Sequence, residues 1–312
     1  MTHRFRSPFI FRILLSIFFC GILSPIIFAE EGNDPPVKSL NILTIGNSFS
    51  YSLSKNDIFL HVVRSVPGFD VNLQSLSIGG WTLQGHWENI VKEEANREDR
   101  HFKDFTYREK LESEKWDFVS IQQSSPLSWR PESYWPWATD LRDYVRRYAP
   151  TAEIVLQQTW SYRPDDQRLA EWGLTQGEMA DRIVDAYNQA AERLDLRIIP
   201  VGWAVKLARE NQPGGYEPFR PEDYEYPDLP SMDRFLVGNV KWSDDHSRIE
   251  GDSYHLNLRG RYLQSCVWFA FLYDHPATDV TYVPEGMTDE DARFLREMAQ
   301  KAVEEFPQTR KK

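Results

Sequence analysis

Cysteine is scarce in this sequence: its 312 residues contain only Cys20 and Cys266. A small domain held by several disulfides is therefore excluded, and a hydrophobic core must hold the fold. A content of 41% hydrophobic and 14% aromatic residues is sufficient for such a core. Cys266 lies in "YLQSCVWFAFLY", where buried packing is expected rather than thiol reactivity.

The sequence also has fewer basic than acidic residues. The chain has 36 Lys and Arg against 47 Asp and Glu, and its formal net charge is -11. Proteins that bind nucleic acids neutralise phosphates with clustered Lys and Arg. No nucleic-acid partner is therefore expected.

Long hydrophobic runs are confined to the first 29 residues, which predict a secretory signal peptide. Three arginines precede the apolar "ILLSIFFCGILSPIIFA", and the acidic "EEGNDPP" follows it. The run is short for a membrane span and is interrupted by Pro25, so cleavage near Ala29 is favoured over a stable membrane anchor. A lipoprotein through Cys20 is disfavoured by the bulky Phe19. We expect a periplasmic or extracellular protein, with residues 30–38 as a linker.

From Leu40 onward, short apolar runs alternate with longer amphipathic segments. This alternation predicts an α/β fold, a parallel sheet with helices on both faces, in one domain over residues 39–308. The predicted strands are "NILTIG", "VNLQSLSI", "WDFVSIQ", "AEIVLQQ" and "LRIIPVG". The predicted helices lie near 53–65, 84–113, 133–148, 176–194, 257–273 and 288–306.

Residues 207–250 interrupt this pattern with a stretch rich in Pro, Gly, Tyr and acids. A connection of this length is either a functional lid or binding loop, or a surface excursion particular to this chain. Both interpretations remain open from the sequence.

Residues that follow the strands are of interest because ligands bind at the carboxyl ends of strands in open parallel sheets. In "GNSFS", Gly46 allows a sharp exit from the first strand, and Ser48 lies where a helix would begin. Ser48 can be a nucleophile there, or only the cap of that helix.

A general base for Ser48 is offered about 200 residues later, in "GDSYHLNLRGRY". Asp252 and His255 are spaced so that a turn can bring the carboxylate to the imidazole ring. The same pair can also be a capping aspartate and a surface histidine. A third possibility is a metal site formed by Asp252 with Asp244, Asp245 and His246, although their spacing matches no established metal signature.

Donors for an oxyanion are available after the second and third strands. Gly79 and Gly80 in "SIGGWTLQGH" can bring backbone N–H groups close to a substrate. Gln122 in "SIQQSSP", with Gln123 as second choice, can donate from a side-chain amide.

These segments together resemble the blocks of the SGNH, or GDSL-like, hydrolase superfamily over roughly residues 40–272. The resemblance implies a three-layer α/β/α sandwich with a parallel sheet of about five strands. It also implies Ser48 as nucleophile and oxyanion donor, His255 as base and Asp252 as the residue that orients it. Gly79 or Gly80 would be the backbone oxyanion donor.

The third block departs from the family, because glutamine stands where the family commonly has an asparagine in "GxND". The combination of "GNSFS", "IGG…H", "WDFVSIQQS" and "DSYHLN…GRYL" resembles a less characterised bacterial branch with glutamine at this strand end. Gln122 keeps an amide there, but its reach is one methylene longer.

The resulting hypothesis is an exported serine esterase that needs no metal or organic cofactor. Tryptophans on or near the predicted site loops suit sugar rings, or they pack the rim of the site. An O-acetylated glycan is the first expected substrate, and lipid or small aryl esters are alternatives. A glycan-binding protein without turnover and a metal-dependent hydrolase are the competing hypotheses. The proposed substrate-binding residues are Trp81, Gln123 and Trp160, and the other site-side tryptophans are Trp129, Trp135 and Trp137.

Overall fold

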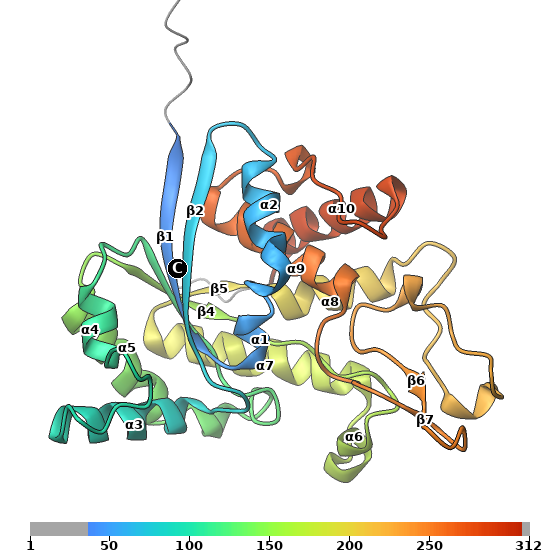
Figure 1. Ribbon diagram of the computed structural model, residues 1–312, viewed down its shortest axis with the longest axis horizontal. Helices are drawn as coiled ribbons and strands as arrows, with labels where there is room; N and C mark the ends of the chain where they lie inside the picture. Colours follow the sequence, from blue (N-terminus) through green and yellow to red (C-terminus); the bar gives the residue numbers. More distant parts are fainter. Residues whose placement is uncertain (1–36, 308–312) are drawn as a thin grey trace, which may run out of the picture. The chain divides into compact units, whose positions relative to one another are not determined.

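The computed structural model describes residues 37–307 (Figure 1). The predicted signal peptide, residues 1–29 with Cys20, lies outside the described residues, as does nearly all of the predicted linker 30–38. Within the described range no helix combines the length and the apolar character needed to cross a membrane.

Five parallel strands form the central sheet, in the order β2-β1-β3-β4-β5. This is the doubly wound order in which the chain starts near the middle and builds toward both edges. Residues at strand ends line up across the sheet, with Gly46 beside Ser77 and Ile45 beside Ile121. The predicted α/β fold with about five parallel strands is confirmed. The strands are β1 (Lys38–Gly46), β2 (Phe69–Ser77), β3 (Phe118–Ile121), β4 (Glu153–Gln157) and β5 (Arg197–Ile199).

The strands form where mostly apolar residues follow one another, because both faces of the sheet are covered. Ile42 and Leu43 of β1 point to opposite faces and are both fully buried, and so are Val119 and Ser120 of β3. Runs of this kind cannot be satisfied by one-sided burial. The central strands are therefore the core of the molecule.

Helices cover the sheet in two groups. In the first, α3, α4, α5 and α7 pack against one another, and in the second, α9 packs against α2, α8 and α10 (Figure 1). The first group consists of α3 (Leu83–Ala95), α4 (Tyr107–Glu112), α5 (Trp137–Tyr148) and α7 (Gln176–Leu194). The second consists of α2 (Ile58–Arg64), α8 (Val201–Glu210), α9 (Leu258–Tyr273) and α10 (Asp289–Glu305). Cys266 of α9 is buried, as predicted.

The predicted helix over 84–113 is two helices, α3 and α4. The Asn96 side chain accepts a hydrogen bond from the Glu98 N–H, which turns the chain out of the helix. Thr106 and Glu109 then form a capping box that starts α4. Local capping thus overrides a periodicity that is continuous in the sequence.

The segment predicted as an excursion over 207–250 begins with the end of α8, which the sequence pattern missed because Pro200 follows the last strand directly. Beyond Glu210 it contains two short 3₁₀ turns and a small antiparallel hairpin of β6 (Lys241–Trp242) and β7 (Ile249–Glu250). A short helix, α6 (Gln167–Trp172), was also not predicted.

Candidate active site

The loop from β1 to the short helix α1 (Ser48–Tyr51) presents Ser48 at the carboxyl edge of the sheet. Asn47, not Ser48, caps this helix: its Oδ1 accepts from the Phe49 N–H at 3.0 Å. Ser48 is the first residue of the helix, and its N–H finds no acceptor in residues 37–307. The hydroxyl of Ser48 is thus not needed to cap α1.

Ser48, His255 and Asp252 form a hydrogen-bonded chain. The Ser48 Oγ lies 2.8 Å from His255 Nε2, and His255 Nδ1 lies 2.6 Å from Asp252 Oδ2. Because a carboxylate only accepts, Nδ1 carries the hydrogen and Nε2 is left to accept from the serine hydroxyl. The imidazole and carboxylate side chains are 32% and 27% exposed, so a ligand can approach them from solvent.

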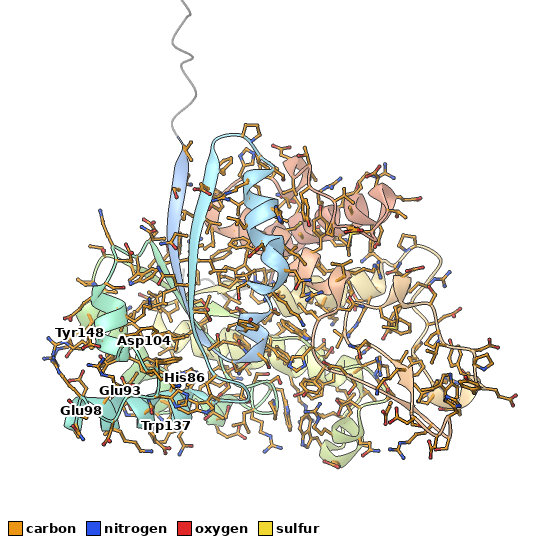
Figure 2. The ribbon with its side chains drawn as sticks, viewed as in Figure 1. His86, Glu93, Glu98, Asp104, Trp137 and Tyr148 are labelled. Carbon is orange, nitrogen blue, oxygen red and sulfur yellow. The ribbon has the colours of Figure 1, made fainter. Side chains whose placement is uncertain are left out.

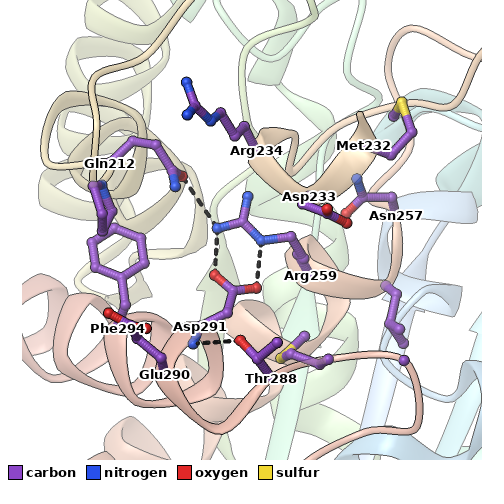
Figure 3. A pocket seen from close by; sticks show the side chains of 14 residues that line it. Gln212, Met232, Asp233, Arg234, Asn257, Arg259, Thr288, Glu290, Asp291 and Phe294 are labelled. Carbon is purple, nitrogen blue, oxygen red and sulfur yellow. Dashed lines mark hydrogen bonds and ion pairs between the residues drawn. The ribbon is translucent and has the colours of Figure 1, made fainter. Parts of the chain in front are cut away.

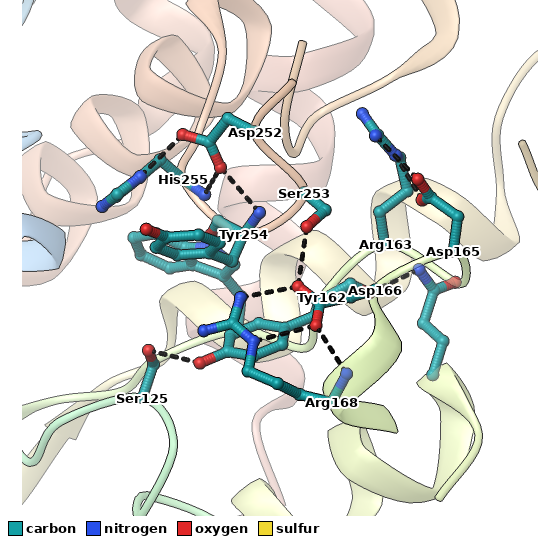
Figure 4. Close-up of polar contacts among 12 residues, drawn as sticks. Ser125, Tyr162, Arg163, Asp165, Asp166, Arg168, Asp252, Ser253, Tyr254 and His255 are labelled. Carbon is teal, nitrogen blue, oxygen red and sulfur yellow. Dashed lines mark hydrogen bonds and ion pairs between the residues drawn. The ribbon is translucent and has the colours of Figure 1, made fainter. Parts of the chain in front are cut away.

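The second oxygen of Asp252 is held by the backbone of its own loop. Oδ1 accepts from the N–H groups of Tyr254 and His255 at 2.8 and 2.9 Å (Figure 4). Burial raises the pKa of Asp252, but the hydrogen bonds from His255 and from these two N–H groups outweigh it and lower the pKa to about 2. Asp252 is therefore ionised at neutral pH.

The predicted excursion holds this loop from one side. The Gly238 N–H donates to the His255 carbonyl at 2.6 Å, and the Asn239 N–H donates to the Asp252 carbonyl at 2.9 Å. Gly238 has a φ of +84, and a Cβ there would lie 2.2 Å from the Asp252 carbonyl oxygen. Only glycine fits this approach. Its role could not be foreseen, because "VGN" has no distinguishing pattern.

The segment after β4 holds the same loop from the other side. Trp160 Nε1 donates to the Tyr254 carbonyl at 2.8 Å, and the Arg163 N–H donates to the Ser253 carbonyl at 2.8 Å. The Ser253 hydroxyl donates to Asp166 at 2.7 Å (Figure 4). The loop that carries His255 is therefore tied to two elements that are distant in sequence.

Trp160 has a different place from the one expected for a substrate-binding residue. Its ring is fully buried and stacks on Phe49, with 4.1 Å between ring centroids. A buried ring cannot contact an incoming sugar, so Trp160 supports α1 and the loop with Tyr254. Trp81 is half-buried beside His86 and His101, which leaves part of its surface open.

The three remaining Trp side chains named from the sequence vary in exposure. Trp129 is buried, while Trp135 and Trp137 are half-buried. The Trp135 ring lies under the Arg193 guanidinium, at 3.8 Å. These positions favour packing of the rim over a continuous aromatic binding surface.

Gln122 also differs from the expectation of a side-chain oxyanion donor. Its Nε2 donates to Asn47 Oδ1 at 3.1 Å and to the Gln123 carbonyl at 3.0 Å, while its Oε1 accepts from the Ser50 hydroxyl. Both amide hydrogens are thus used inside the protein. The extra methylene carries the amide into a buried network that braces Asn47 and α1.

Gln123 is likewise buried and fully bonded. Its Oε1 accepts from the N–H groups of Leu83 and Ser124, and its Nε2 donates to the Ser133 carbonyl at 2.8 Å. It joins the loops after β2 and β3 and has no free group for a substrate, contrary to the substrate-binding role expected for it.

Gly79 and Gly80 lie in an exposed turn closed by the Trp81 N–H and the Ile78 carbonyl at 3.1 Å. Within residues 37–307 no acceptor takes the N–H groups of these two glycines. Asn47 Nδ2 donates to the Trp81 carbonyl at 3.0 Å, which fixes this turn to the residue next to Ser48. The turn thus offers free backbone donors beside the candidate nucleophile.

His86 of α3 is a supporting residue that the sequence pattern marked only as part of "IGG…H" (Figure 2). It is fully buried, and its Nε2–H donates to the Gly46 carbonyl at 2.8 Å, so its Nδ1 accepts from the Tyr107 hydroxyl at 2.6 Å. Burial lowers the pKa of His86 to about 4. The neutral ring therefore anchors the end of β1 without adding charge beneath Ser48.

The acids considered for a metal site are not assembled as one. Asp245 accepts from the Ser243 and Ser247 hydroxyls, and His246 stacks on Tyr226. In the described range no three or more His, Cys, Asp or Glu side chains are grouped so as to hold a metal ion.

Residues 41–242 match the model of the family described as "Domain of unknown function (DUF4886)". The chain belongs to the DUF4886 family. A crystal structure of a DUF4886 family protein from Bacteroides uniformis is 26% identical, with a TM-score of 0.68 over 86% of this chain and 95% of that one. No curated protein sequence matches this DUF4886 protein.

Two further solved structures are similar at lower identity. One is a candidate SGNH hydrolase from Slackia heliotrinireducens, at 19% identity and a TM-score of 0.49 over 74% of this chain and 97% of that one. The other is a candidate GDSL-like lipase from Parabacteroides merdae, at 13% identity and a TM-score of 0.44 over 77% of this chain and 99% of that one. The fold of this DUF4886 protein is the α/β fold described above, with five parallel strands in the order β2-β1-β3-β4-β5.

Proposed function

We propose that this DUF4886 protein is an exported serine esterase of SGNH type. The observation that carries the proposal is the unbroken hydrogen-bonded chain from the Ser48 hydroxyl through the His255 ring to the Asp252 carboxylate. A serine is a weak nucleophile unless a base takes its proton, and here the base and the group that orients it are both present.

In the proposed reaction, Ser48 Oγ attacks the ester carbonyl carbon while His255 Nε2 takes the hydroxyl proton. The Asp252 carboxylate stabilises the imidazolium that forms. His255 then gives the proton to the leaving alcohol as the carbon–oxygen ester bond breaks, and an acyl group remains on Ser48. Water, activated by the same imidazole, releases the acid and restores the serine.

The oxyanion of the tetrahedral intermediate needs donors that are not already in use. Within the described part of the chain, the N–H groups of Ser48, Gly79 and Gly80 meet this condition. We assign these backbone groups, and not the Gln122 amide, to the oxyanion. Each donor of this kind contributes about 10²–10³ in rate in serine hydrolases.

We further propose that the substrate is a carbohydrate ester, with an O-acetyl group as the acyl part. Two aromatic side chains support this: Trp81 is partly open beside the glycine turn, and Tyr51 of α1 is 56% exposed one turn after Ser48. Exposed rings of this kind suit the apolar faces of sugars. The mechanism uses no metal or organic cofactor.

The test is covalent labelling with a fluorophosphonate, followed by acetate release from acetylated xylo-oligosaccharides and from p-nitrophenyl acetate. We expect one adduct, on Ser48, and its loss in Ser48→Ala and His255→Gln. Faster release from the acetylated sugars than from the aryl ester supports the carbohydrate substrate. An unlabelled Ser48 and no acetate from any ester, together with binding of the intact glycans, would instead identify a binding protein on the same fold.

A further inference from the structure

Three arginines of the described chain are buried: Arg163, Arg209 and Arg259. Burying a charged group is costly unless an opposite charge accompanies it. Arg163 meets this condition through two contacts with Asp165, at 2.5 and 2.9 Å. Their charges cancel close to the loop that carries His255 (Figure 4).

Arg259 meets the condition in the same way. Two of its nitrogens contact the two Asp291 oxygens at 2.7 and 2.6 Å, on one side of a pocket of about 670 Å³ (Figure 3). A third contact, at 3.1 Å, goes to Gln212. The guanidinium in this pocket is therefore neutralised and largely bonded before any ligand arrives.

Arg209 of α8 is the exception. It is 8% exposed, and its contacts are with the Ser161 hydroxyl at 2.7 Å and the Ser161 carbonyl at 3.2 Å. It forms no ion pair with any carboxylate of residues 37–307. Burial lowers the pKa of Arg209, and the Tyr216 phenol, not a carboxylate, acts in the opposite direction. The charge thus lacks the partner that the other two buried arginines have.

Arg209 lines a pocket of about 370 Å³ between α7, α8 and Tyr216. Gln176 and Gly177, the first two residues of α7, also line it, and their N–H groups have no acceptor in the described chain. The N-terminal end of this 19-residue helix adds positive potential.

Two further charged side chains line the same pocket, Lys206 and Glu210. The Lys206 ammonium contacts Asp181 and lies 3.9 Å from Glu210, and these two carboxylates are 63% and 54% exposed, so solvent screens their charges. The buried charge at this pocket is that of Arg209.

We propose that this pocket binds a small oxyanion, the carboxylate or phosphate group of a small molecule, with Arg209 as its counter-charge. The two hydrogen bonds to Ser161 leave the rest of the planar guanidinium fork to a second acceptor, and carboxylate and phosphate both match that fork. Neither Ser48, Asp252 nor His255 lines the pocket. The proposal is thus independent of esterase activity.

The experiment is titration calorimetry on the mature protein at constant ionic strength, with inorganic phosphate, glucuronate and acetate, and with glucose as the uncharged control. We expect saturable binding of at least one anion and none of glucose. Arg209→Gln should weaken binding at least tenfold, and Arg209→Lys should restore part of it. Arg146→Gln, on the exposed face of α5, should bind as the wild type does.

The three anions distinguish between a phosphate and a carboxylate as the charged group of the ligand. Preference for phosphate indicates a phosphate ester as ligand, and preference for glucuronate over acetate indicates an acidic sugar. Equal affinity in wild type and Arg209→Gln, or no saturable binding of any anion by the wild type, would overturn the proposal.

A second variant covers the case in which Arg209→Gln does not fold. Ala180→Leu enlarges a small buried side chain that lines the pocket and leaves the guanidinium in place. It should also remove anion binding, and unchanged binding would count against the pocket. Ser48→Ala should bind the anions normally, which separates this site from the proposed catalytic one.

Discussion

Alanine substitutions at Ser48 and at its neighbour Asn47 should have opposite consequences. Ser48 contacts His255 through its hydroxyl, whereas Asn47 Oδ1 accepts from Phe49 N–H and Gln122 Nε2 at 3.0 and 3.1 Å, and its Nδ2 donates to Trp81. The hydroxyl of Ser48 serves chemistry in this arrangement, and the amide of Asn47 serves structure.

The magnitudes follow from those contacts. Asn47→Ala removes a helix cap, which costs about 1 kcal/mol. It also leaves buried partners unpaired, at about 1–3 kcal/mol each when they find no other partner. Since such terms do not add fully, we expect a loss of about 3 kcal/mol. Ser48→Ala removes one partly exposed hydrogen bond and gains about 0.5 kcal/mol of helix propensity, so its net change should stay below about 1 kcal/mol.

Urea unfolding followed by circular dichroism measures both changes. With a slope of about 3 kcal/mol/M for a domain of this size, Asn47→Ala should move the midpoint down by about 1 M, and Ser48→Ala by less than about 0.3 M. Fluorophosphonate labelling should vanish in Ser48→Ala and persist, more slowly, in Asn47→Ala. A midpoint for Ser48→Ala as low as that for Asn47→Ala, with labelling intact, would refute this division of roles.

Two further variants probe the loop that carries His255. Asp252→Asn should slow labelling by about 10³–10⁴. The pKa of Asp252 is lowered to about 2 from 3.8, so the stabilising contribution of its charge is present above about pH 4 and is lost as the pH falls toward 2. The difference in unfolding free energy between wild type and Asp252→Asn should therefore close over that pH range. A difference that stays constant would contradict this reasoning. Gly238→Ala should lower the free energy of unfolding, measured in urea, by about 1–3 kcal/mol more than Gly286→Ala does. Both glycines have a φ of +84, but only a Cβ at position 238 would meet backbone atoms, those of Asp252. Equal losses in the two variants would show that the close approach is unimportant.

Predictions from local pattern succeeded where local physics dominates. The buried strands appear as apolar runs because both faces of the sheet are covered, and α7 has the bounds expected from its periodicity. Predictions failed where a single residue decides where a helix ends or begins. Asn96 ends α3 inside a periodic stretch, and Pro200 places α8 directly after β5.

The candidate site shows the same division. Ser48, Asp252 and His255 could be named from short motifs, because nucleophile, base and orienting acid are recognisable residue types. The roles of Gln122 and Trp160 could not be foreseen, because a side-chain amide or an indole looks the same in the sequence whether it faces a substrate or the core. Their burial and their contacts are decided by neighbours from other strands.

The sequence by itself determined the fold class and the residues able to carry the proposed chemistry, since hydrophobic periodicity and residue type are local properties. Only the tertiary structure decided which atoms meet. About 200 residues separate Ser48 from His255, and their contact depends on a loop held by residues near 238 and 160–166. The tertiary structure likewise showed that Arg209 is buried with no carboxylate of residues 37–307 beside it, because such an absence is visible only once the neighbours are in place.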